Sequence, residues 1–108
     1  MFMTKVTVNS GICGLVSEIS VEADEMQTCK VSIVSACDAI KAMEAGLSEV
    51  DGYTECFARF SDSEVYKAAE AHCKHLACPV PSGIIKAIEV ACGLALPKNA
   101  EIVVEKKI

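Results

Sequence analysis

The chain has 108 residues, of which 52% are hydrophobic, and a formal net charge of −5, so we expect one globular domain spanning residues 1–108. Its ten Lys and Arg residues are scattered, which argues against a nucleic-acid surface. No apolar run reaches the length of a membrane span and the first residues lack the layout of a signal peptide, so we expect a cytoplasmic protein without a membrane partner.

The first third of the chain has the pattern of three strands. Apolar and polar residues alternate over 5–8, and a turn cluster follows from Asn9 to Gly14. Alternation returns over 15–22 and, after an acidic turn, over 30–33. The sequence therefore predicts an antiparallel meander of three strands, one face of which needs a cover.

A helix is predicted directly after the third strand. Ser35 and Asp38 have the spacing of a helix start with Ser35 as N-cap, and apolar residues follow at helical spacing until Gly46. Residues 47–60 show neither the helical nor the strand period.

Two further helices and a last strand are predicted in the second half. Ser61 and Glu64 form a capping box, which predicts a helix over 63–76 whose inward stripe is Val65, Ala69, His72 and Leu76. Pro81 opens another apolar helix, Pro97 ends it, and 101–105 reads as a short strand. The expected fold is α+β: a three-stranded meander covered on one face by about three helices, with a short C-terminal strand.

Seven cysteines in so short a chain indicate either a secreted disulfide framework or an intracellular thiol or metal role. The count is odd and no export signal is present, so we expect the cysteines to be reduced. No C-x-x-C pair occurs, so a metal site must be assembled from distant segments.

Cys13, Cys37 and Cys78 each lie at an expected element boundary, two of them beside Gly or Pro, where a side chain is accessible. Cys37 is placed in the first turn of its helix, where the helix dipole favours a thiolate. Three thiolates at one end of a sheet suit zinc or an iron–sulfur cluster, and they leave one coordination position open.

Cys56 and His75 are the candidates for a fourth ligand, with His72 behind them because it falls on the apolar stripe. Cys29, Cys73 and Cys92 are interpreted as packing residues, since free cysteine behaves as a small hydrophobe.

The order of these motifs resembles that of the U-type iron–sulfur cluster scaffold proteins, the family of IscU and the N-terminal domain of NifU. The matching segments are Cys13-Gly14 between two strands, the run from Ala36 to Ile40 at a strand-to-helix junction, and Cys78 ahead of a long helix. The resemblance implies a cluster-binding role for Cys13, Cys37 and Cys78, with a cluster donor or acceptor protein as partner.

Two positions depart from that family's pattern. Leu15 stands where the family has an aspartate, and Ala77 where it has a histidine before the third cysteine. The resemblance credits the aspartate with keeping the cluster labile, so a site without it would hold its metal more permanently.

The leading hypothesis is a metal- or iron–sulfur-cluster-binding protein that acts as scaffold or carrier and not as an enzyme, either alone or as a homo-oligomer. The first alternative is an enzyme, nucleophilic or thiol-redox, that uses Cys37 with His72 or His75 as proton partner. The second is an interaction module with purely structural cysteines.

Overall fold

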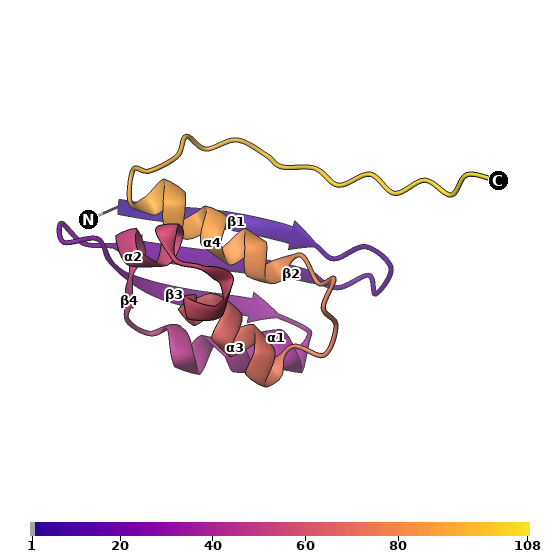
Figure 1. Ribbon diagram of the computed structural model, residues 1–108, viewed down its shortest axis with the longest axis horizontal. Coiled ribbons are helices and arrows are strands. Elements are labelled where there is room, and N and C mark those ends of the chain that lie inside the picture. Colours follow the sequence, from indigo (N-terminus) through magenta and orange to yellow (C-terminus); the bar gives the residue numbers. More distant parts are fainter. Residues whose placement is uncertain (1) are drawn as a thin grey trace.

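A computed structural model describes residues 2–108 and contains one four-stranded antiparallel sheet in the order β1-β2-β3-β4 (Figure 1). The predicted three-stranded meander is confirmed; the first and third strands are longer than the alternating segments that predict them, and the second is shifted by one residue. The strands are β1 (Phe2–Asn9), β2 (Val16–Ala23), β3 (Thr28–Ser35) and the two-residue β4 (Val50–Asp51).

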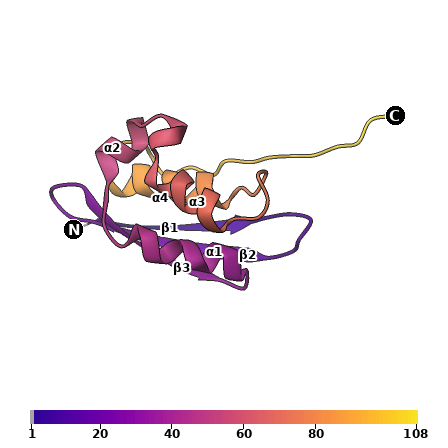
Figure 2. The ribbon, with the colours of Figure 1, turned by 60° about the horizontal axis from the view of Figure 1, so that its bottom comes forward.

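One face of the sheet is buried and the other is open, as the period-2 pattern predicts. Ile19 and Val21 of β2 and Val31 of β3 are completely buried, whereas Val34 on the opposite face of β3 is exposed. Helices α2 (Gly52–Phe57), α3 (Glu64–His72) and α4 (Val80–Ala91) lie together on one side of the sheet (Figure 2). The number of helices on this face agrees with the predicted number of about three.

Helix α4 lies over β1 and β2 and supplies most of the apolar cover. Ile84 and Ile88 are fully buried, as their helical spacing predicts. The helix ends before Gly93 and not at Pro97. The Gly93 N–H donates to the Val90 carbonyl and the Leu94 N–H to the Glu89 carbonyl, a Schellman motif that needs the positive φ of +73° at Gly93.

The helix predicted after β3 is split into α1 (Asp38–Ala42) and the 3₁₀ helix η1 (Met43–Leu47). Its N-cap is Cys37 and not Ser35. Ser35 instead exchanges a hydroxyl hydrogen bond with Ser17 on the neighbouring strand and accepts one from the Cys37 N–H at 3.1 Å. The cross-strand partner, which the local sequence does not reveal, shifts the helix start by two residues.

Helix α3 begins later and ends earlier than predicted. Its N-cap is Ser63, whose hydroxyl accepts from the Tyr66 N–H, while Ser61 lies inside the 3₁₀ helix η2 (Phe60–Asp62). Val65 and Ala69 are buried as predicted, but His72 and Leu76 are exposed. The predicted inward stripe is wrong over its last half because the helix ends at His72 and the chain turns away into a loop.

The predicted strand at 101–105 is not formed, and the fourth strand of the sheet is β4 instead. Residues 95–108 have no helix or strand assignment, and Figure 1 shows them leaving α4 as an extended tail. Among the helices of residues 2–108, none is long and apolar enough to cross a membrane.

The outer edge of β3 is covered by side chains rather than by a full strand. Glu44 accepts a hydrogen bond from the Ile33 N–H at 2.6 Å, and the Lys41 ammonium donates to the Ile33 carbonyl at 2.8 Å. The same Lys41 and Glu44 form an ion pair at 2.9 Å. The Ile33 N–H, followed by Lys41, holds the pKa of Glu44 below its usual value of 4.5.

We expect this cover to make stability depend on pH in the acid range. Because the pKa of Glu44 is lowered in the folded state, its contribution is complete above pH 4.5 and is lost as pH falls through the lower folded value. Glu44→Gln should therefore reduce the denaturant midpoint at pH 7, and the difference from wild type should shrink below pH 4.5. A difference that stays constant from pH 7 to pH 3 would contradict this.

Candidate functional site

The three cysteines predicted to converge lie on segments that meet at one end of the sheet. Ser17 of β2 pairs with Ser35 of β3, so the β1–β2 turn and the end of β3 share that end. The first turn of α4 lies there too, since a Cβ on Gly83 would come within 2.5 Å of Val8 near the end of β1. We call this the hairpin end; it comprises the turn 10–15, Cys37 and the loop 73–79.

Cys78 lies at the centre of the hairpin end, two residues before α4, and packs against the hydrophobic core. The Cys73 thiol, the Ser10 hydroxyl and the Val80 backbone lie near enough to its thiol to influence its pKa. Burial raises the pKa of Cys78 and the Cys73 thiol adds to this, while Val80 and Ser10 lower it. Cys78 therefore connects the α3–α4 loop to the hairpin that carries Cys13.

Cys73 is the site residue that sequence reasoning missed. The sequence pattern predicts it as a packing residue of α3, but it is the C-cap of that helix and its thiol donates to the His75 carbonyl at 3.4 Å. The Cys78 N–H donates to the same carbonyl at 3.1 Å, which folds the loop so that the two thiols lie near each other. The sequence does not reveal that α3 ends early, at His72. A helix continuing to residue 76 would separate the two thiols.

Cys37 and Cys13 occupy the expected boundaries with different exposure. Cys37 is half-buried against the core as the N-cap of α1. Cys13 is exposed on the β1–β2 turn, which is closed by the hydrogen bond from the Ser10 N–H to the Leu15 carbonyl. One thiol is thus fixed by packing and the other projects from a turn.

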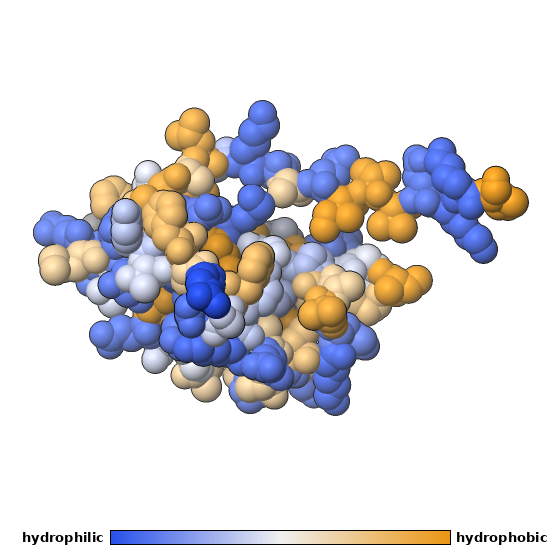
Figure 3. All heavy atoms as spheres, in the orientation of Figure 1, coloured by the Kyte–Doolittle hydropathy of each residue, from blue (hydrophilic) through white to orange (hydrophobic). Residues whose placement is uncertain are grey.

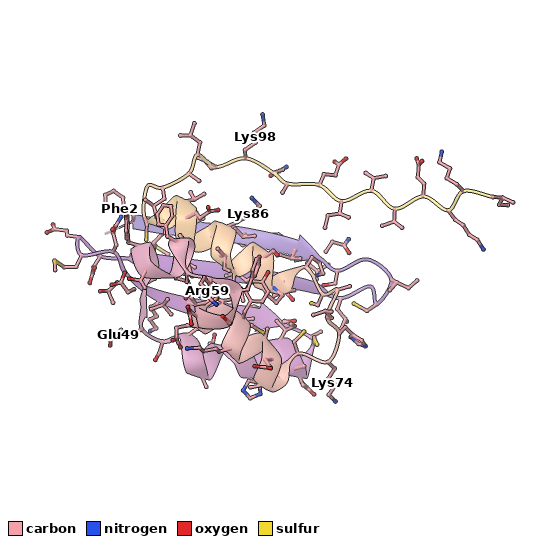
Figure 4. The ribbon with its side chains drawn as sticks, viewed as in Figure 1. Phe2, Glu49, Arg59, Lys74, Lys86 and Lys98 are labelled. Atoms are coloured by element: carbon pink, nitrogen blue, oxygen red, sulfur yellow. The ribbon has the colours of Figure 1, made fainter. Side chains whose placement is uncertain are left out.

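The two histidines do not pack into the hairpin end. His72, at the last position of α3, is exposed, and so is His75, whose backbone carbonyl is the group used inside the loop. Lys74, between them, marks this loop at the end of α3 in Figure 4. An imidazole ligand would have to turn inward from solvent.

Cys56, the other candidate for a fourth ligand, belongs to a second cysteine cluster. It lies on α2 near Cys92 and Glu89, at the C-terminal end of α4, whereas Cys78 precedes the N-terminal end of that helix. Twelve helical residues span roughly 18 Å, so Cys56 is far from Cys78. At the hairpin end, the cysteine near Cys78 is therefore Cys73 and not Cys56.

The second cluster packs tightly at the opposite end of the sheet. The sulfur atoms of Cys29 and Cys92 are 3.4 Å apart, and the Cys29 thiol donates to the Gln27 carbonyl at 3.6 Å. Burial, followed by Cys92, raises the pKa of Cys29 to about 12, and burial, followed by Glu89, raises that of Cys56 to about 12. These two thiols stay protonated at neutral pH, which fits the predicted packing role of Cys29.

Comparison with known proteins identifies the family. The model of DUF6951, described as a family of unknown function, matches residues 4–104. The chain belongs to the DUF6951 family. No curated protein matches the sequence.

In this DUF6951 protein the matched region contains both cysteine clusters. Within residues 2–108, no three His, Cys, Asp or Glu side chains lie close enough together to hold a metal ion. Cys73 and Cys78 lie near each other, and Cys37 and Cys13 lie on neighbouring segments of the same end. Binding at the hairpin end would therefore require at least one of these segments to move inward.

Proposed function

We propose that the protein binds zinc or an iron–sulfur cluster through the thiols of the hairpin end, as a carrier or scaffold. The observation that carries the proposal is that the segments bearing Cys13, Cys37 and Cys78 meet at one end of the sheet, where Cys73 and Ser10 also lie near Cys78. Cysteine sulfur is the soft ligand that zinc and iron–sulfur clusters select. No enzymatic step is needed for this role.

The placement of the cysteines supports the same proposal. Cys13 lies in a turn between two strands, Cys37 at a strand-to-helix junction and Cys78 before the last helix, the arrangement that the resemblance to U-type scaffold proteins implies. Cys73 is the best-placed fourth thiol because it already lies near Cys78. A cluster donor or acceptor protein is the corresponding partner.

The ligands differ in how far they must move. Cys73 and Cys78 are held together by the loop, and Cys37 is held by packing. Cys13 is exposed on a short turn whose first residue, Ser10, already lies near Cys78, so an inward movement of this turn would bring a further thiol to the site. A site completed by one exposed turn is open to exchange, which suits a carrier better than a permanent structural metal.

Metal content of protein purified without oxygen tests the proposal. We expect stoichiometric zinc, or iron with acid-labile sulfide, either as isolated or after reconstitution with Zn²⁺ or with Fe²⁺ and sulfide. Cys37→Ser and Cys78→Ser should each lower the bound metal by about tenfold or more, because removal of a direct ligand weakens a site by at least as much as loss of an outer partner. Cys73→Ser should do the same.

Cys56→Ser is the matched control, since it makes the same chemical change in the second cluster and should leave metal content unchanged. Circular dichroism of each apo variant separates loss of a ligand from loss of the fold. Full metal retention by both Cys37→Ser and Cys78→Ser, or no binding by folded wild type after reconstitution, would refute the proposed function.

A further inference from the structure

Strand β1 forms one edge of the sheet, and its outer side is unpaired. Its pairing with β2 is continuous from Phe2 opposite Ala23 to Asn9 opposite Val16, without a bulge. In an antiparallel pair, alternate residues direct their N–H and C=O groups away from the partner strand. Within residues 2–108, no backbone hydrogen bond is made to that outer side of β1. The edge is therefore available to another strand.

The two edges of the sheet are treated differently. At β3, the backbone of Ile33 is covered by Glu44 and Lys41, and β4 pairs with Thr28 and Cys29. At β1, none of the usual protections of an edge is present except the charge of Lys5. An eight-residue edge of this kind is a template for strand addition.

The C-terminal tail has the composition of a strand but no partner. Residues after Leu94 donate or accept no backbone hydrogen bond in the described part of the chain. The tail nevertheless exposes Ile102, Val103 and Val104, and it ends in the equally exposed Ile108. Figure 3 shows these hydrophobic residues standing in solvent along the tail, between charged ones. An unpaired backbone and exposed β-branched side chains indicate a segment that is completed by pairing.

We propose that the tail of one copy of the chain adds to the outer edge of β1 in a second copy, as an antiparallel fifth strand, and that the exchange is reciprocal. Val104 then lies opposite Val6, Ile102 opposite Val8, and Glu105 opposite Lys5. The result is a symmetric dimer in which each sheet has five strands.

Side-chain chemistry selects this register. Val6 and Val8 are half-buried on the face that α4 covers, so Ile102 and Val104 extend the apolar face beside them. On the opposite face, Lys5 is paired with Glu18 at 3.1 Å and gains Glu105 as a second carboxylate neighbour. A shift by one residue would place the two glutamates of 101–105 on the apolar face instead.

The ends of the paired segments also match in this register. Ile108 lies opposite Phe2, and both are exposed in the single chain. Lys106 lies opposite Thr4, whose buried hydroxyl oxygen has no hydrogen-bond partner among the described residues.

A second copy is required because the tail of the same chain runs the wrong way. The tail leaves α4 near the start of β1 and runs in the same direction as that strand, as the positions of Phe2 and Lys98 indicate (Figures 1 and 4). Folding back onto its own β1 would therefore give a parallel pair. The antiparallel pairing is available only between chains.

Analytical ultracentrifugation of the full chain over a range of concentrations tests the proposal. We expect a reversible dimer. Val104→Asp should raise its dissociation constant by about 100-fold or more, because two buried valines per dimer are replaced by charges. Val103→Asp is the matched control: it makes the same change on the next residue, which faces away from α4, and should have a much smaller effect.

Isotope-filtered NMR on a mixture of labelled and unlabelled chains identifies the paired strands. Contacts between the methyl groups of Val104 in one chain and Val6 in the other are expected. A monomer at all concentrations would overturn the proposal, and so would a dimer that Val104→Asp and Val103→Asp weaken equally. Tail-to-β1 contacts found only within one chain would replace it with the parallel arrangement.

Discussion

Glu55→Ala is expected to lower the free energy of unfolding by about 3–5 kcal/mol, because it removes the acceptor for three donors at the start of α3. Glu55 is only 5% exposed. Its carboxyl group accepts from the Glu64 N–H at 2.8 Å, the Val65 N–H at 3.1 Å and the Ser63 hydroxyl. A truncated side chain would leave these groups inside the protein without a partner.

Chemical denaturation of Glu55→Ala and Glu55→Gln measures the effect. The glutamine variant keeps one acceptor oxygen and should lose less stability than the alanine variant. Glu64→Ala is the control, because Glu64 lies nearby but is exposed and pairs only with Lys67 on the surface, so its loss should cost about 1 kcal/mol or less. Equal losses in Glu55→Ala and Glu64→Ala would show that the buried carboxyl group does not hold α3.

Glu55 also explains why the N-cap of α3 could not be predicted from the sequence. Spacing alone predicts a capping box at Ser61 and Glu64, but the N-cap is Ser63 and the acidic partner is eight residues earlier on α2. A local window does not contain that partner. The helix start is decided by tertiary contact, which is the kind of information that propensity and spacing lack.

The meander and α4 were predictable because their signals are local. Alternation along β2 and β3 and the apolar stripe of α4 each reflect one continuous buried face. The same meander brings the turn of Cys13 and the strand end before Cys37 to one end of the sheet. That part of the candidate site follows from topology and needs no knowledge of side-chain contacts.

For the same reason, the sequence could not predict that Cys73, and not Cys56, lies near Cys78. Which cysteine joins Cys78 depends on where α3 ends and on which end of α4 meets α2. The sequence shows neither, since Leu76 continues the helical pattern beyond the actual end of α3 at His72. Cysteines on short helices and loops are therefore assigned to a cluster only by the fold.

Gly52→Ala is expected to lower the free energy of unfolding by about 2–3 kcal/mol, because it overpacks the second cysteine cluster. A Cβ at this position would lie 2.3 Å from the Cys92 sulfur, 2.9 Å from the Cys29 sulfur and 3.0 Å from the Gln27 carbonyl oxygen. The Gly52 N–H also donates to that carbonyl at 2.8 Å, so the backbone of α2 cannot retreat without losing the bond.

A double-mutant cycle with Cys92→Ala separates this clash from a general effect of alanine. Cys92→Ala removes the atom nearest to the added Cβ, so Gly52→Ala should lower the free energy of unfolding less in the Cys92→Ala background than in wild type. The remaining loss is due to Cys29 and Gln27. Gly46→Ala is the matched control, since nothing lies within 4 Å of the position that its Cβ would occupy, and it should be neutral or slightly stabilising. If the effects of Gly52→Ala and Cys92→Ala on the free energy of unfolding simply add, the two sulfur atoms do not restrict the size of the side chain at position 52. The cluster is then packed more loosely than its 3.4 Å sulfur contact implies.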